Sequence, residues 1–246
     1  MNIVIIGGTG GIGAALSKDL IKNNNLYIGS RNVDKINNLI STINNDSQIK
    51  NKLDGFKVDV TDFESIENFL NKSNDFLGSI DCIINCVGSL LLKPAHLTTE
   101  KDLLDTYRIN VFSCFGIMKY GFKYLKNSEG NLILFSSSAS NVGLKNHECI
   151  SSAKAAVSGF VLSAASTYSK YNIRVNAIAP GLVDTPLTSR ITNNQISLDY
   201  SKDLHGLKRI GKPQNFIPIV NSLIDSRSDW VTGQTFFIDG GLSNVK

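Results

Sequence analysis

The first thirteen residues constrain the fold of this chain most strongly. Residues 2–6 (NIVII) are a short run rich in Ile and Val, which is typical of a buried parallel strand. Four glycines occupy the next five positions, and apolar residues resume at helical spacing from residue 14. A strand, a glycine turn and a helix N-terminus together form an anion site, because backbone N–H groups and the helix dipole point at the ligand.

The spacing of the glycines indicates a dinucleotide site. The run fits G-x-G-x-x-G through Gly8, Gly10 and Gly13, and it also fits the wider G-x-x-x-G-x-G through Gly7, Gly11 and Gly13. Glycine clusters also form ordinary turns, but the position between a strand and a helix favours pyrophosphate binding. The residues expected to contact the cofactor at this turn are Gly7, Thr9, Gly10, Gly11, Ile12 and Gly13.

The end of the next expected strand, residues 26–31, predicts which dinucleotide binds. Dinucleotide sites usually place a carboxylate about twenty positions past the glycines, where it binds the ribose 2′-hydroxyl. Here that position holds Ser30, followed by Arg31. A hydroxyl and a guanidinium would bind a 2′-phosphate, which a carboxylate would repel. We therefore expect NADP(H) in preference to NAD(H), with a solvated loop charge as the alternative role for Arg31.

Composition excludes several other classes. The 246-residue chain has a formal net charge of +4 and no basic block, so nucleic acid is not an expected partner. No apolar stretch approaches the roughly 18 residues of a membrane span, and the first strand begins too early for a signal peptide. The cysteines lie in or beside apolar segments without metal-ligand spacing: Cys82, Cys86, Cys114 and Cys149. A reduced, cytoplasmic protein without a metal is expected.

Strand and helix patterns alternate along the whole chain. Further strands are expected at 56–60, 80–85, 131–135, 173–178 and 235–238, and helices at 33–43, 99–125, 151–170 and 213–224. This order predicts an α/β Rossmann fold, a doubly wound parallel sheet of about seven strands with helices on both faces. We expect one domain over residues 1–246, in which the polar, weakly periodic segment 184–210 is a substrate lid.

Several polar residues fall where ligands gather in such a sheet. Asp59, at a strand end beside Val60, is either a cap for the helix that follows or a partner for the adenine amino group. Asn110 lies beside an apolar stripe of the 99–125 helix, where an unbound amide is disfavoured. The serines at 136–138 follow a strand at the carboxyl edge of the sheet and are placed to face a ligand.

With these motifs the chain resembles the short-chain dehydrogenase/reductase family over nearly its whole length. The family's T-G-x-x-x-G-x-G turn appears with Ile6 in place of Thr. Its remaining motifs match Asn85-Cys86-Val87-Gly88, Asn110, Ser136-Ser137, Pro180-Gly181, Thr185, Arg209 to Pro213, Thr232 to Gln234 and Asp239 to Gly241. The resemblance implies an NAD(P)-dependent oxidoreductase acting on a small molecule. It adds as cofactor contacts Asp59, Val60, Asn85, Val87, Gly88, Lys154, Pro180, Gly181, Val183 and Thr185.

The family's catalytic centre is only partly present. Asn110, Ser137 and Lys154 match its asparagine, serine and lysine, but residue 150, where Y-x-x-x-K requires tyrosine, is Ile. Ile150 lies thirteen residues after Ser137, the family's usual serine-to-tyrosine spacing, so the register is secure. In the family that phenol protonates the alkoxide formed on hydride transfer, and losing a positioned acid typically costs about 10²–10⁴-fold in rate.

Three interpretations remain open. His147, seven residues before Lys154, resembles the Tyr-to-Lys spacing of the family's enoyl reductases and could polarise an enone carbonyl, although it could equally be an exposed loop residue. Alternatively, Ser137, Lys154 and an ordered water on Asn110 suffice for an already electrophilic substrate. In the third, the protein is catalytically impaired and acts as a cofactor-binding or partner subunit of a hetero-oligomer.

Self-association is also expected. The helix over 151–170 is dominated by Ala and Ser, whose small side chains allow close helix packing across a subunit interface. Together with the family resemblance this predicts a homotetramer or homodimer. The lid segment carries no recognition motif, so the sequence does not identify the substrate.

Overall fold

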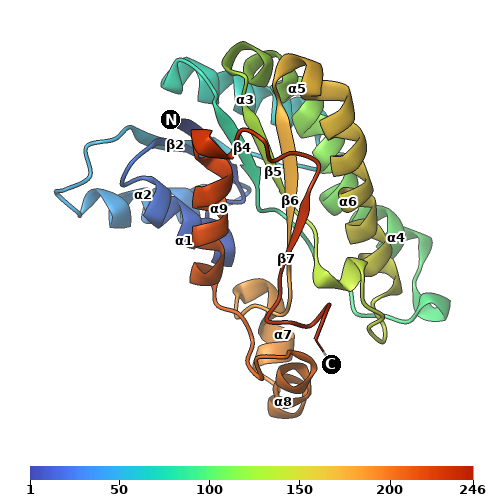
Figure 1. The fold of residues 1–246 in the computed structure, drawn as a ribbon. Coiled ribbons are helices and arrows are strands. Elements are labelled where there is room, and N and C mark those ends of the chain that lie inside the picture. The colour runs from blue at the N-terminus through green and yellow to red at the C-terminus, as the bar shows by residue number, and fades with distance from the viewer. Residues whose placement is uncertain (246) are drawn as a thin grey trace.

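The structure is a computed structural model that describes residues 1–245. In these residues a parallel sheet of seven strands has the order β3-β2-β1-β4-β5-β6-β7 (Figure 1). The strands are β1 (Asn2–Ile6), β2 (Asn25–Ser30), β3 (Leu53–Lys57), β4 (Cys82–Asn85), β5 (Asn131–Phe135), β6 (Arg174–Pro180) and β7 (Thr235–Ile238). The order confirms the predicted doubly wound Rossmann fold.

Helices cover both faces of the sheet, as Figure 1 shows. They are α1 (Gly11–Leu20), α2 (Val33–Asn44), α3 (Phe63–Leu77), α4 (Glu100–Tyr107), α5 (Ser113–Ser128), α6 (Glu148–Tyr168), α7 (Ser189–Thr192), α8 (Gln195–Leu204) and α9 (Ile217–Ile224). Alternation along β1 separates two cores: Val4 and Ile6 pack with α3, α5 and α6, whereas Ile3 and Ile5 pack with α1, α2 and α9.

The strand order reverses between β1 and β4, which are neighbours although the chain makes two excursions between them. In open α/β sheets a ligand binds in the crevice beyond the carboxyl ends of the strands at such a point. The glycine turn leaves β1 at this crevice, and the 86–88 segment leaves β4 beside it, with Cys86 N–H bonded to Ile6 O at 2.8 Å. The fold thus brings the two best-matched motifs together.

Three elements differ from the sequence-based expectations. β3 runs from Leu53 to Lys57 and not over 56–60, so Asp59 lies in the connection that follows it. The expected single helix over 99–125 is broken by a π-helical turn, Arg108–Phe112, between α4 and α5. The segment 184–210 contains the short helices α7 and α8, which its weak periodicity did not predict.

The expectation that no stretch could span a membrane needs correction. By length and composition alone, the helical stretch Glu148–Tyr171 meets that test, with 44% of the window buried in the fold. Core helices pass the same test, and α6 packs its buried side chains, including Val157 and Val161, against the sheet. Its apolar character is therefore accounted for by packing within this fold.

Candidate active site

The turn between β1 and α1 has the tight geometry that only glycine permits. Gly7 has a φ of +81°, and its N–H is bonded to Gly29 O at 2.8 Å. A Cβ at Gly13 would lie 2.2 Å from Gly7 O, and a Cβ at Gly11 would lie 2.5 Å from Thr185 Cγ2. The turn therefore packs closely against the start of α1 and against Thr185. Its glycines have no side chains to separate the backbone from a ligand.

A cavity of about 590 Å³ opens over this turn. Most of the predicted cofactor residues line it: Gly7, Thr9, Gly10, Gly11, Ile12, Gly13, Ser30, Arg31, Asp59, Val60, Val87, Gly88 and Thr185. Asn85 does not; it is buried, and its Oδ1 accepts a hydrogen bond of 3.1 Å from Val87 N–H, so it shapes the 86–88 segment from behind. The glycine cradle and the size of the cavity fit an extended dinucleotide.

One end of this cavity is polar and basic. Thr9 Oγ1 donates a hydrogen bond of 2.8 Å to Ser30 Oγ, which joins the glycine turn to the end of β2. Arg31 and Lys35 line the same end. Lys35 was missed by the sequence analysis, although its position one helical turn beyond Arg31 could have indicated it.

Asp59 does not cap α3, because Asp62 does so by accepting a hydrogen bond from Glu64 N–H. Instead Asp59 Oδ1 accepts bonds from the N–H and Oγ1–H of Thr61, at 2.9 and 2.7 Å. Burial by itself would raise the pKa of Asp59. The two hydrogen bonds from Thr61 and the positive charge of Arg31 outweigh this effect and hold the pKa below its ordinary value. The carboxylate remains at the cavity wall, where a hydrogen-bond donor of a ligand could reach it.

A second cavity, of about 470 Å³, adjoins the first. The predicted residues that line it are Ser137, His147, Lys154, Pro180, Gly181 and Val183, together with four that also line the first cavity, Ile12, Val87, Gly88 and Thr185. Its other walls include apolar side chains that the sequence analysis did not single out: Leu90, Leu92, Leu144, Leu187, Ile191, Tyr200, Leu204 and Leu242. These come from five segments: the 88–97 loop, the connection between β5 and α6, the 3₁₀ turn Pro186–Thr188, helices α7 and α8, and the C-terminal segment. The segments are far apart in the sequence, so the sequence does not show that they meet. Both cavities share the 86–88 wall.

Lys154 reaches the junction of the two cavities from α6. Its Nζ donates a hydrogen bond of 2.8 Å to Phe135 O, and burial lowers the pKa of this amine to about 8. A Cβ at Gly88 would lie 3.3 Å from both Lys154 Nζ and Asn110 Oδ1, so Gly88 lies close to both groups. The buried lysine, the amide and the 86–88 segment are thus brought together.

The π-helical turn explains how Asn110 is accommodated. Its side chain is only 2% exposed, and Nδ2 donates to Thr106 O at 2.9 Å and to Ser89 Oγ at 2.8 Å. Ser89 N–H donates back to Asn110 Oδ1 at 3.3 Å. The amide is therefore satisfied in the protein, and Ser89 is a partner that the sequence did not reveal.

The serines at the end of β5 have different roles. Ser136 Oγ donates to Lys154 O at 2.9 Å and so ties β5 to α6, whereas Ser138 Oγ donates to the buried Asp239 at 2.8 Å. Ser137 accepts a bond of 3.2 Å from Ala139 N–H and leaves its own hydroxyl proton for a ligand. Of the three, Ser137 is the side chain suited to substrate binding.

Ile150 lies on α6 one turn before Lys154 and is 3% exposed. It lines the second cavity together with Ser137 and Lys154. An alkyl side chain supplies apolar surface there and no proton, so the acid for any reduction must come from another group.

Two histidines line the same cavity with different capacities. His147 Nδ1 lies 2.7 Å from Lys145 O, and since a carbonyl only accepts, Nδ1 carries the proton and Nε2 is left for a ligand. His205 is 3% exposed, its Nδ1 lies 2.6 Å from Ser201 O, and its Nε2 accepts from Leu182 N–H at 3.2 Å. Both nitrogens of His205 are occupied, so its role is structural.

Residues 1–245 contain no group of three or more His, Cys, Asp or Glu side chains arranged to hold a metal ion.

Comparison with known proteins gives a consistent assignment. A family model described as Enoyl-(Acyl carrier protein) reductase matches residues 7–243. A tropinone reductase homologue of Arabidopsis thaliana is 29% identical over 99% of this chain and 76% of its own length. The 3-oxoacyl-[acyl-carrier-protein] reductase FabG of Buchnera aphidicola is 29% identical over 97% of this chain and 96% of its own length.

A solved structure extends the comparison to the fold. ElxO with NADP bound has a TM-score of 0.89 and 26% identity, covering 98% of each chain, and a tyrosine-to-phenylalanine variant of ElxO has been solved with NADPH bound. With its strand order, glycine turn and buried asparagine and lysine, the chain belongs to the short-chain dehydrogenase/reductase family of oxidoreductases.

Proposed function

We propose that this protein is an NADPH-dependent reductase that delivers hydride to a small-molecule carbonyl or conjugated double bond, with a proton donor other than tyrosine. The observation that carries the proposal is that the two cavities share the 86–88 wall, with Lys154 beside Gly88 and with Ser137 lining the second cavity. A substrate in the second cavity would thus lie against the end of a dinucleotide held in the first.

The residues present fit NADP(H). The glycine turn and the N-terminus of α1 would hold the pyrophosphate, and Ser30, Arg31 and Lys35 would hold the 2′-phosphate. Lys154 would bind the nicotinamide ribose, and Thr185 the carboxamide. The bound cofactor supplies the hydride, and everything else in the reaction falls to side chains of this chain. Preference for NADP(H) over NAD(H) rests on Ser30 and Arg31 standing where a carboxylate would select NAD(H).

His147 is the proposed proton donor. Its Nδ1 is held by Lys145 O, so a second proton on the ring goes to Nε2, the nitrogen available to the cavity. Histidine is the side chain that most often serves as a positioned general acid in enzymes. Ser137 Oγ would bind the substrate carbonyl, and the apolar walls would keep out water. This arrangement suits an enone. A hydrogen bond to its carbonyl oxygen polarises the conjugated system, and the hydride is added to a carbon of the conjugated double bond.

The proposal is tested by following NADPH oxidation with enones and with the matching saturated ketones. We expect turnover of the enones, and a loss of about 10²-fold or more in kcat for His147→Ala. The exposed His96 provides the matched control, because His96→Ala removes an imidazole that lines neither cavity. Unchanged kcat in His147→Ala would leave Ser137 and Lys154 as the groups that activate the substrate.

A partner-subunit role is the second candidate, and Ile150 in place of an acid favours it. Under this proposal the chain binds NADPH, reduces neither class of substrate, and co-purifies with a catalytic relative. Native purification from the source cells, followed by mass spectrometry of bound chains, distinguishes the two. A homogeneous, active oligomer would exclude the partner-subunit role.

We also propose that the chain forms a homodimer or homotetramer in a reducing cytoplasm. The support is apolar surface on the outer side of α5 and α6, where Phe115 is 54% and Leu162 63% exposed, together with four unpaired cysteines. Light scattering of the wild type and of Leu162→Glu tests the interface. A smaller particle for Leu162→Glu supports it, and an unchanged mass excludes this face.

A further inference from the structure

The second cavity is the substrate cavity of the proposed function, and its wall at His147 is connected to the start of α4. Lys93, in the 88–97 loop, donates its backbone N–H to Asn146 O at 2.8 Å. Asn146 has a φ of +63°, a left-handed conformation that its short amide side chain tolerates. His147 follows directly, and its carbonyl accepts the first hydrogen bond of α6, from Ser151 N–H at 2.7 Å. The His147 backbone is therefore held from both sides.

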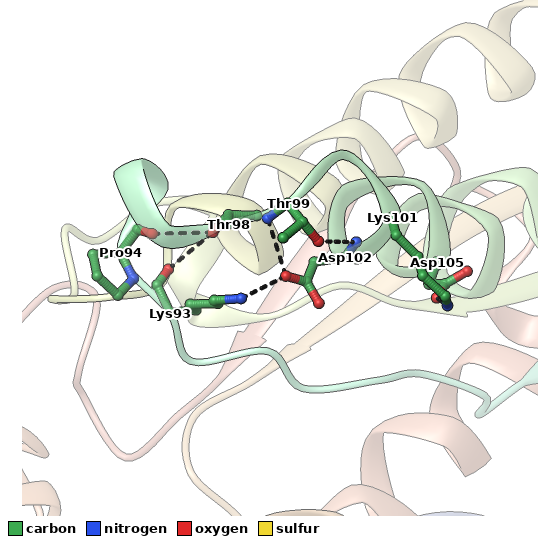
Figure 2. Close-up of polar contacts among 7 residues, drawn as sticks. All are labelled: Lys93, Pro94, Thr98, Thr99, Lys101, Asp102 and Asp105. Atoms are coloured by element: carbon green, nitrogen blue, oxygen red, sulfur yellow. Dashed lines mark hydrogen bonds and ion pairs between the residues drawn. The ribbon is translucent and has the colours of Figure 1, made fainter.

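The side chain of Lys93 is held as well. Its Nζ lies 2.7 Å from Asp102 Oδ2, with the two side chains only 33% and 30% exposed (Figure 2). Asp102 also accepts from Thr99 N–H at 3.0 Å, and Thr99 Oγ1 accepts from Asp102 N–H at 3.1 Å. These reciprocal bonds are the capping box that begins α4. One carboxylate thus starts a helix and anchors the loop lysine.

Further bonds keep the Lys93 peptide from rotating away. Thr98 Oγ1 donates to Pro94 O at 3.1 Å and lies 3.5 Å from Lys93 O, as Figure 2 shows. Lys93 and Asp102 are nine residues apart, and neither lines the cavities. The arrangement is thus a bridge from the capping box, through the Lys93 peptide, to the carbonyl that precedes His147.

We propose that the Lys93–Asp102 ion pair is a positioning pair that holds the 145–147 turn so that Lys145 O fixes the His147 tautomer and leaves Nε2 for the substrate. The role rests on the proposed function of His147 as proton donor. An imidazole aimed by a fixed partner on its other nitrogen is a general means of presenting a defined acid. Loss of the pair frees the Lys93 peptide, the Asn146 conformation and with them the ring.

The same helix supplies a matched control. Lys101 and Asp105 form an ion pair one turn apart on α4, with side chains 84% and 48% exposed, and Figure 2 shows it apart from the Lys93–Asp102 contact. Disrupting this pair removes the same kinds of charge, a lysine ammonium and an aspartate carboxylate, from a pair that lies wholly on α4. We therefore compare Lys93→Met and Asp102→Asn with Lys101→Met and Asp105→Asn, and include Lys93→Arg to keep the ion pair.

The first readout needs no substrate. The chain has three histidines, so long-range ¹H–¹⁵N spectra resolve each ring and report its tautomer. We expect the wild type, Lys93→Arg and both Lys101–Asp105 variants to show His147 with its proton on Nδ1. Lys93→Met and Asp102→Asn should show mixed tautomers for His147 and unchanged signals for His205. Identical His147 signals in Lys93→Met and the wild type would overturn the proposal.

The second readout is the pH profile of kcat with the best enone. We expect Lys93→Met to lower kcat about tenfold, as a misaimed catalytic group does, with the affinity for NADPH unchanged and Lys93→Arg near the wild type. Other titratable side chains also face this cavity: Cys86, Lys145, Lys154, Tyr200 and His205, with Glu148 adjacent on the chain. The pH profile of His147→Ala shows their contribution, and its difference from the wild-type profile shows that of His147.

The two experiments separate the two possible failures. If His147→Ala leaves kcat unchanged, the proposed proton donor is wrong, whatever the ring signals do. If His147→Ala lowers kcat but Lys93→Met changes neither the tautomer nor kcat, His147 is the donor and the positioning pair is excluded. Equal losses in Lys93→Met and Lys101→Met would also overturn the proposal, because only a general effect on α4 would explain them.

Discussion

Lys154 donates a hydrogen bond from Nζ to the carbonyl oxygen of Phe135 at 2.8 Å, and this neutral acceptor is its partner in the fold. Among residues 1–245, none of the ion pairs includes Lys154. A buried ammonium without a carboxylate is disfavoured, which is why the pKa of Lys154 falls to about 8. The site therefore contains an amine that can change its charge within the range of ordinary assays.

The first prediction concerns stability and pH. In the folded chain Lys154 loses its proton near pH 8, whereas in the unfolded chain it keeps the proton up to about pH 10.5. Between these values the unfolded state binds more protons, so raising the pH stabilises the wild type relative to Lys154→Met, by up to roughly 3 kcal/mol. Urea unfolding of both proteins at pH 7, 8, 9 and 10 measures this difference.

Comparing the two proteins removes the opposing contributions of groups that do not interact with Lys154. Burial raises the pKa of both Tyr27 and Cys86 to about 12, so their titration destabilises the fold as pH rises. These groups are present in both proteins and cancel in the difference. A difference in unfolding free energy that stays constant from pH 7 to 10 would show that Lys154 keeps its ordinary pKa in the fold.

The second prediction concerns the missing phenol. Ile150→Tyr places a hydroxyl one helical turn before Lys154, on the wall of the substrate cavity. We expect kcat for reduction of a saturated ketone to rise by about 10²-fold, since a positioned acid contributes at least that much. The measurement is NADPH oxidation at saturating ketone. Ile150→Phe adds the same ring without the proton, and equal rates for the two variants would contradict the prediction.

Much of the fold could be predicted because its signals are local. The expected strands over 131–135 and 235–238 coincide with β5 and β7, whose apolar runs are bounded by polar and glycine residues. The glycine turn likewise carries its own geometry in its sequence. The strand expected at 56–60 was displaced because β3 is an edge strand, and its pairing with β2, where Leu26 lies opposite Leu53, sets its limits.

The rest could not be predicted because it depends on contacts between distant residues. The apolar stripe expected along the 99–125 helix includes Leu104 and Phe115, yet these are 41% and 54% exposed. The π-helical turn around Asn110 interrupts the regular helical spacing on which that expectation depended. The bond from Asn110 to Ser89 that accompanies this turn joins residues 21 positions apart. Tyr200 and Leu242 also line the substrate cavity through contacts between segments that are distant in the sequence. The residues around them in the sequence do not indicate this position.

The third prediction concerns cofactor choice. Arg31→Ala should weaken NADPH binding by at least about tenfold, the usual loss for a charge-assisted contact, and leave NADH binding within about twofold. Lys35→Ala should have a smaller effect of the same kind, because Lys35 lines the same end of the cavity. Fluorescence titration with each cofactor measures both.

Lys22→Ala is the control for this charge change, because Lys22 is an exposed cation paired with Asp19 that lines neither cavity. Equal losses of NADPH and NADH affinity in Arg31→Ala would mean that the guanidinium supports the turn and does not bind the 2′-phosphate. Weak binding of both cofactors by the wild type would favour a fold that no longer uses a dinucleotide.

The last prediction concerns the segment over 184–210, for which His205 is the anchor. Its ring joins α8 to the turn after β6, since Nδ1 donates to Ser201 O and Nε2 accepts from Leu182 N–H. His205→Leu approximately keeps the volume but leaves the partly buried Leu182 N–H without its partner. We expect the free energy of unfolding to fall by about 1–3 kcal/mol, the usual cost of an unsatisfied buried donor.

His205→Leu should affect substrate binding more than cofactor binding, because α8 lines the substrate cavity and not the glycine-turn cavity. In His205→Leu we therefore expect KM for substrate to rise, the affinity for NADPH to stay within about twofold, and trypsin to cleave after Arg190 or Lys202 sooner. His96→Leu, an exposed histidine outside both cavities, should change none of these. If protease sensitivity in His205→Leu rises equally across the whole chain, His205 stabilises the fold as a whole, and the segment is not a separately anchored lid.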